Sequence, residues 1–97
     1  MSRPRQRRMS VEFDPVDEVI LTLPAATIDT LSQRLTRQQQ DQLITDLRRT
    51  YTAEGVALWL RGRNRNLNRT SPLTLLAWGS AHDIEAVLAE AARVGNA

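Results

Sequence analysis

Apolar residues recur along the chain at spacings of three and four, which is the spacing of one face of an α-helix. They form five such groups: Val16, Val19, Ile20 and Leu23; Ile28, Leu31 and Leu35; Leu43, Ile44, Leu47 and Tyr51; Val56, Ala57 and Leu60; and Ile84, Val87, Leu88 and Ala91. No stretch alternates between apolar and polar residues for long, and no Asn-Gly or Asp-Gly pair predicts a hairpin. The pattern therefore predicts an all-α fold, a small bundle of five or six short helices.

Capping residues set the expected ends of these helices. Asp14-Pro15 and Ser71-Pro72 each join a side chain that caps free amides to a proline that the first turn tolerates. Thr36 opens a capping-box pattern, in which a glutamine follows three residues later, and Ser80 caps the last helix with Asp83 at the third position. The expected helices span residues 15–23, 25–35, 37–51 and 53–61, followed by one from 72 to 79 and one from 81 to 95.

The stretch from Trp59 to Gly79 contains a polar crossing that is dense in arginine and asparagine. Gly62 is predicted to close the preceding helix in the left-handed conformation, and three asparagines favour local turns. Leu67 is the only apolar residue between positions 63 and 70, so we expect it to reach the core. In so small a domain each tryptophan by itself favours the core, Trp78 included. The arginine-rich loop is equally compatible with a solvated surface.

The charge is unevenly distributed along the chain. All thirteen basic residues are arginines, and the formal net charge is +2. Four of them stand in the first eight residues: Arg3, Arg5, Arg7 and Arg8. The other nine face eleven acidic residues, so the rest of the chain is mildly acidic. We predict that residues 1–12 form a disordered basic tail, which either keeps the chain soluble or holds phosphates without reading sequence.

The chain offers little that could perform catalysis. It has no cysteine, its only histidine is His82, and its four glycines are too scattered for a phosphate-binding loop. We expect His82 to be an exposed polar residue. No apolar run reaches the roughly 18–20 residues of a membrane span. We therefore expect a bacterial, cytoplasmic binding protein with no catalytic residue, cofactor, metal or membrane partner, which works as a homodimer or in a hetero-oligomer.

The C-terminal half carries a series of short motifs. They are Trp59-Leu60-Arg61, Asn64, Asn66-Leu67, Ser71-Pro72-Leu73, Leu75-Leu76, Gly79 and the segment from Ile84 to Leu88. In this order and spacing, over about residues 50–94, they resemble the toxin-binding domain shared by the Xre/MbcA/ParS antitoxins. The resemblance divides the chain into the tail, residues 13–51 and residues 52–97. The middle part has room for a dimerisation region or a degenerate helix-turn-helix, and the last part is the toxin-binding-like domain.

The resemblance implies a small antitoxin that is encoded beside a RES-domain toxin. Toxins of this kind consume NAD⁺, and the antitoxin blocks access to their active site. The contact in this family often uses the closing helix and the chain end. The residues that the resemblance assigns to toxin binding are Trp59, Arg61, Asn64, Arg93, Val94, Gly95, Asn96 and Ala97. Only three residues follow Val94 here, which does not favour a deep plug.

A second interpretation comes from the same region. Residues 50–65 also resemble the second half of a helix-turn-helix, since Xre-type repressors often end their recognition helix with Trp-Leu-x-Gly. The residues that would then contact DNA are Arg61, Arg63, Arg65 and Arg69, with Arg3, Arg5, Arg7 and Arg8 entering a minor groove. This interpretation leaves the pattern from Pro72 to Gly79 unexplained. Toxin neutralisation is the favoured hypothesis, operator DNA binding the alternative, and a scaffold or phage-borne accessory role the remaining one.

Overall fold

The computed structural model describes residues 15–96. Within that range the chain forms six α-helices and one short 3₁₀ helix, with no strand. They are α1 (Pro15–Ile20), α2 (Ala25–Arg34), α3 (Arg37–Arg48), α4 (Ala53–Arg61), η1 (Arg65–Leu67), α5 (Pro72–Trp78) and α6 (Ala81–Gly95). The predicted all-α fold is confirmed. The predicted basic tail, with Arg3, Arg5, Arg7 and Arg8, lies outside the described residues, as do the helix cap Asp14 and the chain end Ala97.

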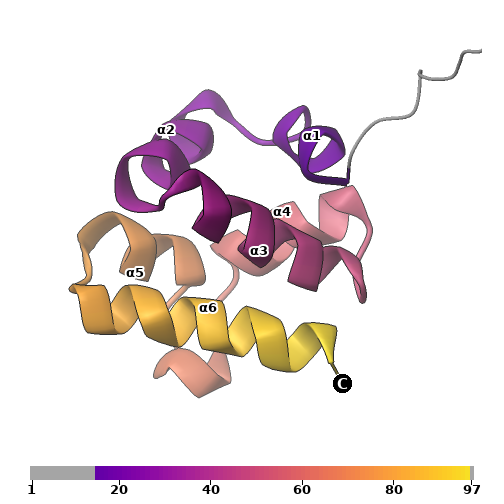
Figure 1. Cartoon of the computed structure of the whole chain (residues 1–97). Helices are drawn as coiled ribbons and strands as arrows, with labels where there is room; N and C mark the ends of the chain where they lie inside the picture. Colours follow the sequence, from indigo (N-terminus) through magenta and orange to yellow (C-terminus); the bar gives the residue numbers. More distant parts are fainter. Residues whose placement is uncertain (1–14, 97) are drawn as a thin grey trace, which may run out of the picture.

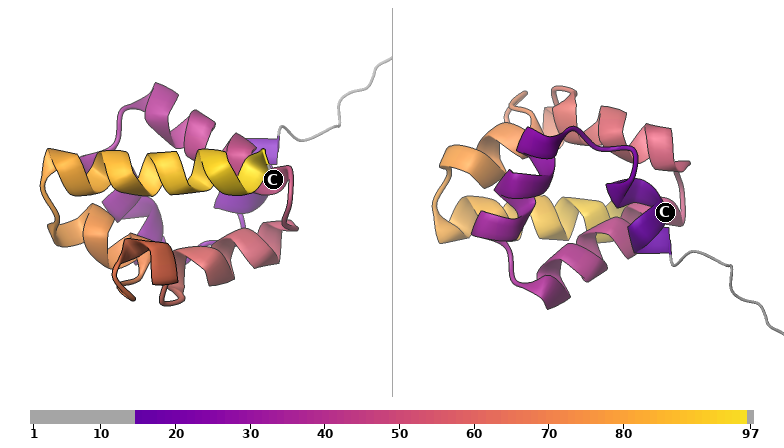
Figure 2. Two further views of the ribbon diagram at one scale, coloured as in Figure 1. Left: turned by 90° about the horizontal axis from the view of Figure 1, so that it is seen from below. Right: turned by 90° about the horizontal axis from the view of Figure 1, so that it is seen from above.

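The longest helix, α6, runs along one side of the molecule (Figure 1). α3 crosses it and forms the most extensive contact between any two helices, while α5 also packs against it. α1 packs on α3 and α4, and α2 packs on α5, so that both lie on the far side of α3 from α6 (Figures 1 and 2). This arrangement leaves the C-terminal half of α6 beside α4 and the loop that follows it.

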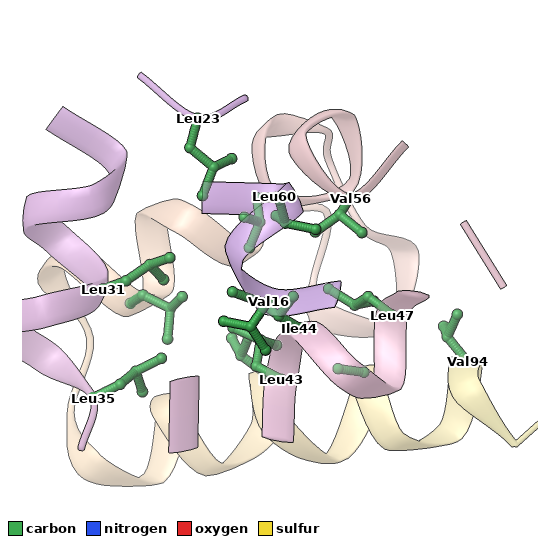
Figure 3. Packing of buried hydrophobic residues seen from close by; sticks show 14 of the residues in the cluster. Val16, Leu23, Leu31, Leu35, Leu43, Ile44, Leu47, Val56, Leu60 and Val94 are labelled. Atoms are coloured by element: carbon green, nitrogen blue, oxygen red, sulfur yellow. The ribbon is translucent and has the colours of Figure 1, made fainter. Parts of the chain in front are cut away.

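One hydrophobic core joins all the helices (Figure 3). Its buried apolar residues are Val16, Val19, Leu23, Leu31, Leu35, Leu43, Ile44, Leu47, Ala53, Val56, Leu60, Leu67, Leu76, Val87, Ala91 and Val94. Each fully buried leucine contributes about 1.5–3 kcal/mol relative to an exposed one. The core is continuous across position 51, so the boundary between residues 13–51 and 52–97 stays a prediction about function.

The first helix ends earlier than the apolar pattern predicts. α1 stops at Ile20, because the Thr22 hydroxyl donates a hydrogen bond to the Val19 carbonyl at 2.7 Å and the chain turns there. Leu23 is still buried, although it lies beyond the helix. Pro24 does not end α1 but stands at the N-cap position of α2.

The third helix also ends before its predicted limit. α3 stops at Arg48 rather than at Tyr51. The Arg48 guanidinium donates from Nη1 to the Tyr51 carbonyl at 2.9 Å, which holds the chain in a turn. Thr52 then starts α4, and its hydroxyl accepts a hydrogen bond from the Gly55 amide at 3.1 Å. α2 ends one residue before its predicted limit, at Arg34.

The predicted capping boxes are confirmed. The Thr36 hydroxyl accepts from the Gln39 amide while the Gln39 side chain accepts from the Thr36 amide, and Ser80 and Asp83 do the same at the start of α6. Each cap is worth about 1 kcal/mol. The C-terminal end of α5 is capped by a residue of α2, because Arg34 donates hydrogen bonds to the carbonyls of Ala77 and Gly79. Tertiary contact therefore completes what the local caps begin.

Gly95 lies where the backbones of α6 and α3 come closest. A Cβ at this position would stand 2.4 Å from the Asp46 carbonyl oxygen, which no real Cβ tolerates. The Thr50 hydroxyl donates to the Val94 carbonyl at 2.9 Å and caps the same end of α6. Gly95 therefore serves the packing of α6 on α3 and is the last residue of the helix.

Candidate functional site

A groove of about 570 Å³ lies between α4 and the C-terminal half of α6. Figure 2 (left) shows the ribbons of α6 and α4 facing each other, with the loop that follows α4 at the end of that helix. It is lined by Tyr51, Gly55, Leu58 and Trp59, by Gly62, Arg63, Asn64, Arg65 and Asn66 of the loop, and by Glu90, Arg93 and Val94 of α6. We call this feature the α4–α6 groove.

The apolar part of the groove comes from both walls. Trp59 is half-buried and packs against the core while it also lines the groove, and Tyr51 does the same. Val94 is buried on the opposite wall. Leu58 also lines the groove and is 61% exposed, so its side chain is open to a partner. The groove thus combines a packed apolar wall with an exposed apolar edge.

A buried carboxylate joins the loop to α6. Glu90 is 8% exposed, and Arg93 donates to it from Nε to Oε1 at 2.9 Å and from Nη2 to Oε2 at 2.7 Å. Asn66 donates from Nδ2 to Oε2 at 3.0 Å. Because a buried charge is costly unless it is hydrogen-bonded and paired, these contacts belong together. Glu90 therefore fixes the loop against the helix.

The same contacts set the ionisation of this cluster. The hydrogen bond from Arg93 lowers the pKa of Glu90 below its ordinary value, burial opposes that shift, and Asn66 adds to it. The hydrogen bond with Glu90 raises the pKa of Arg93. Glu90 is therefore a carboxylate at neutral pH, and Arg93 carries its full charge.

The loop itself is closed by backbone hydrogen bonds around Asn64. Its amide donates to the Thr70 carbonyl at 3.2 Å, and its carbonyl accepts from the Arg69 amide at 2.8 Å. Leu67 is buried, as predicted. The left-handed conformation falls on Asn68 (φ 57°) and Arg69 (φ 63°). The prediction for asparagine is confirmed.

Gly62 does not adopt the predicted left-handed conformation. Its φ and ψ are −81° and 150°, so it continues from α4 in extended form. The reversal of the chain happens six residues later, where the bridge between Asn64 and Thr70 requires it. Glycine was expected to mark the turn because it tolerates positive φ, but the hydrogen bonds of the loop decide where the turn lies.

The arginines of this region are exposed and form no ion pair with any residue in the range 15–96. They are Arg61, Arg63, Arg65 and Arg69. Arg63 and Arg65 line the α4–α6 groove, whereas Arg61 and Arg69 do not. Over residues 15–96 nine arginines are balanced by nine acidic residues. The positive charge is therefore local to this loop.

The structure brings together half of the residues that the resemblance assigned to toxin binding. Trp59, Asn64, Arg93 and Val94 line the α4–α6 groove. Three others do not line it: Arg61, Gly95 and Asn96. The first of these is exposed on α4, and the second packs on α3.

Six groove residues were not among the site candidates taken from the sequence: Tyr51, Gly55, Leu58, Gly62, Asn66 and Glu90. Tyr51 was placed on the predicted apolar stripe, and Leu58 had no assigned role. Glu90 was missed altogether, although one signal was available. Glu90 stands inside the apolar stripe of α6 and three residues before Arg93. Side chains three residues apart on a helix lie close enough to contact each other.

Trp78 is not a core residue, contrary to the sequence-based expectation. It is 85% exposed at the C-terminal end of α5 and does not line the groove. α5 buries Pro72 and Leu76, four residues apart on one face. A residue two positions after Leu76 points to the opposite side of a helix with 3.6 residues per turn. His82 is exposed, as expected.

A second hollow follows the outer face of α3. It measures about 550 Å³ and is lined by Arg37, Gln38, Asp41, Gln42, Thr45 and Arg49, and we call it the α3 hollow. Both of its arginines face an acid. Arg37 lies 3.4 Å from Asp41, and Arg49 lies 3.5 Å from Asp46. This hollow is therefore polar and neutralised within one helix.

Among residues 15–96 no group of three or more histidine, aspartate or glutamate side chains is placed to hold a metal ion. None of the described helices is both long enough and apolar enough to cross a membrane. Within the described region, the groove with its arginines and its buried acid is therefore the candidate functional site.

Comparison with known proteins assigns no family. No protein-family model matches the chain, and no curated protein and no solved structure is significantly similar to it. The likeness of residues 50–94 to antitoxin domains therefore stays a resemblance that short motifs carry.

Proposed function

We propose that this chain is the antitoxin of a type II toxin–antitoxin pair and that it binds a RES-domain toxin through the α4–α6 groove. The proposal joins two independent supports, the motif resemblance of residues 50–94 and the geometry of the groove. It makes the chain a cytoplasmic protein-binding module and not an enzyme. Its partner is a protein that it inhibits by covering the active site.

The observation that carries the proposal is the convergence of residues from different segments on one hollow. Trp59 from α4, Asn64 from the loop and Arg93 from α6 line the same groove. Tryptophan, tyrosine and arginine beside a hollow are the residues that most often dominate the binding energy of protein interfaces. The exposed Leu58 extends the apolar surface at its edge.

The groove is also held in shape before any partner arrives. Glu90 ties the loop to α6 through Asn66, and Leu67 anchors the loop in the core. A rigid site loses less conformational freedom on binding, so more of the contact energy is retained as affinity.

The test is co-expression of the untagged chain with the tagged product of the neighbouring reading frame. We expect a stable complex, and cellular NAD⁺ that is preserved only when both proteins are made. Absence of a complex, or loss of NAD⁺ in its presence, would contradict the proposal.

Two exposed leucines provide a matched pair of variants for this experiment. Leu58→Asn removes an apolar contact at the groove, whereas Leu21→Asn makes the same change at a leucine that does not line it. Both side chains are largely exposed, at 61% and 72%, so neither change should unfold the protein. We expect Leu58→Asn to weaken the complex at least tenfold and Leu21→Asn to leave it intact.

The second candidate function is repression of transcription by DNA binding. The four arginines without ion pairs favour it, since phosphate contacts need free positive charge. α3 and α4 are also joined by only four residues, 49–52, which is as short as the turn of a helix-turn-helix. Against it, the exposed residues of α4 before Arg61 are Glu54 and Leu58, and neither can bind a phosphate. The two functions are compatible, because an antitoxin can also repress its own operon.

A salt titration of binding to the upstream DNA tests this second function. Changing Arg61, Arg63 and Arg65 together to glutamine should lower the affinity and flatten its dependence on salt concentration. An unchanged salt slope would remove the loop from the DNA contact.

A further inference from the structure

We infer that the α4–α6 groove accepts an acidic segment of a partner protein, one that carries carboxylates around an apolar anchor. This deepens the proposed function, and it rests on that function in one respect, namely that the occupant is a protein. The inference concerns the chemistry of the occupant, which the motif resemblance does not specify.

Charge complementarity is the first argument. Three arginines line the groove, Arg63, Arg65 and Arg93, against a single acid, Glu90. That acid is buried, and its oxygens already accept hydrogen bonds from Arg93 and Asn66. Arg63 and Arg65 are exposed and have no ion pair within residues 15–96. The groove therefore presents positive charge that nothing in the described region neutralises.

The orientation of Arg93 supplies the second argument. Its Nε and Nη2 atoms are directed to Glu90, and across residues 15–96 no hydrogen bond is formed by its Nη1. Its side chain is 59% exposed. Glu90 thus acts as a positioning residue, which holds the guanidinium in place while the N–H groups of Nη1 stay available. An incoming carboxylate can accept from them, as guanidinium and carboxylate geometries match.

The apolar wall gives the occupant its second feature. Trp59 and Tyr51 are half-buried in the wall, and Leu58 is exposed at the edge. A purely ionic ligand would leave these surfaces in water. An apolar side chain that stands between the carboxylates of the partner would cover these surfaces and remove them from water, which favours binding.

The same observations favour a peptide over a nucleic acid. A nucleic acid carries charge along its whole length and needs an extended basic surface. Here the positive charge is confined to one loop, in a described region where arginines and acids are equal in number.

Selection from a library of random twelve-residue peptides displayed on phage tests the inference. The targets are the full chain, the variant Arg63→Glu with Arg65→Glu, and the control Arg61→Glu with Arg69→Glu. The control makes the same charge change in the same region at residues that do not line the groove. We expect acidic peptides with an apolar residue from the full chain and from the control, and a switch to basic peptides from the groove variant.

The affinity of one resynthesised acidic peptide for each variant then gives a quantitative test. Calorimetry should show binding at least tenfold weaker to Arg63→Gln with Arg65→Gln than to Arg61→Gln with Arg69→Gln. Equal weakening by both pairs, selection of peptides without acids, or no enrichment at all would overturn the inference.

Two further outcomes separate this inference from the function on which it rests. If acidic peptides bind the groove but the chain fails to protect NAD⁺ in cells, the antitoxin proposal fails and the groove chemistry stands. If NAD⁺ is protected while the charge of the groove has no influence on peptide selection, the inference alone fails.

A random twenty-base-pair duplex serves as the nucleic-acid probe. Its binding in preference to every selected peptide, with loss in the groove variant, would assign the arginines to DNA and overturn the inference.

Discussion

The α4–α6 groove and the α3 hollow are nearly the same size, at about 570 and 550 Å³. Both are lined by arginines. In the α3 hollow each arginine is paired with an acid of α3: Arg37 lies 3.4 Å from Asp41, and Arg49, at the C-cap, lies 3.5 Å from Asp46. In the groove, Arg63 and Arg65 face none within the described residues and lie beside an apolar wall. Volume and arginine content therefore do not distinguish the two hollows, whereas uncompensated charge next to apolar area does.

A buried acid is associated with each hollow: Glu90 lines the groove, whereas Asp46 pairs with Arg49 of the α3 hollow without lining it. Asp46 accepts from Gln42 at 3.0 Å on both oxygens and pairs with Arg49, so these partners all belong to α3 or its C-cap. Glu90 instead accepts from Asn66, which is 24 positions away in the sequence. Asp46 therefore stabilises one helix and its C-cap, whereas Glu90 holds the loop after α4 against α6.

The largest expected effect is at the contact of α3 with α6, the most extensive contact between two helices. Gly95→Ala places a Cβ against the Asp46 backbone, so the helices must move apart. We expect the free energy of unfolding to fall by about 2 kcal/mol, as for other overpacked sites. Thermal unfolding followed by circular dichroism measures it.

The control for that change is Gly62→Ala, where a Cβ would lie 3.1 Å from one carbonyl oxygen and φ is already negative. Its effect should be much smaller. Equal losses at the two positions would show that the approach of the two helices does not constrain Gly95.

The next effect separates the two buried acids. Glu90→Gln and Asp46→Asn each replace a buried carboxylate by an amide, and each should cost about 1–2 kcal/mol in urea unfolding at pH 7. Only Glu90→Gln should also weaken partner binding, because only Glu90 positions Arg93 and Asn66. Equal effects on binding would remove the distinction between the hollows.

A pH series sharpens the same comparison. Since the pKa of Glu90 is lowered in the folded protein, its carboxylate stabilises the fold above the ordinary pKa of 4.5, and this is lost as pH falls through the folded value. The difference in unfolding free energy between the protein and Glu90→Gln should therefore be constant near neutral pH and shrink below about pH 4. A difference that grows in acid would contradict the assigned ionisation.

The smallest effect lies inside the loop. Arg69 holds a φ of 63°, which a non-glycine residue adopts at a cost of about 1 kcal/mol, so Arg69→Gly should stabilise the fold by about 0.5–1 kcal/mol. Asn68→Gly should gain less, because asparagine tolerates this conformation. Peptide binding should stay unchanged in both, as neither residue lines the groove. Loss of binding in Arg69→Gly would extend the site beyond the groove.

Much of the fold could be predicted because its signals are local. Periodicity placed the helices, and the capping boxes at Thr36 and Ser80 fixed two of the starts. The helix ends were less certain, since a contact such as Arg48 with the Tyr51 carbonyl depends on side chains that a pattern does not weigh. The same limit applies to Gly62, whose residue type allowed a turn that the loop placed at Asn68 and Arg69.

The sequence by itself determined the all-α class, the order of the helices, the start of α6 and the arginine-rich loop anchored by Leu67. These follow from interactions within a few residues, which periodicity and caps record directly. Only the tertiary structure decided that Glu90 is buried against Asn66, that Trp78 faces outward and that Arg63 and Arg65 stay without ion pairs while lining an apolar groove. The physical reason is that burial and charge compensation depend on which distant segments meet.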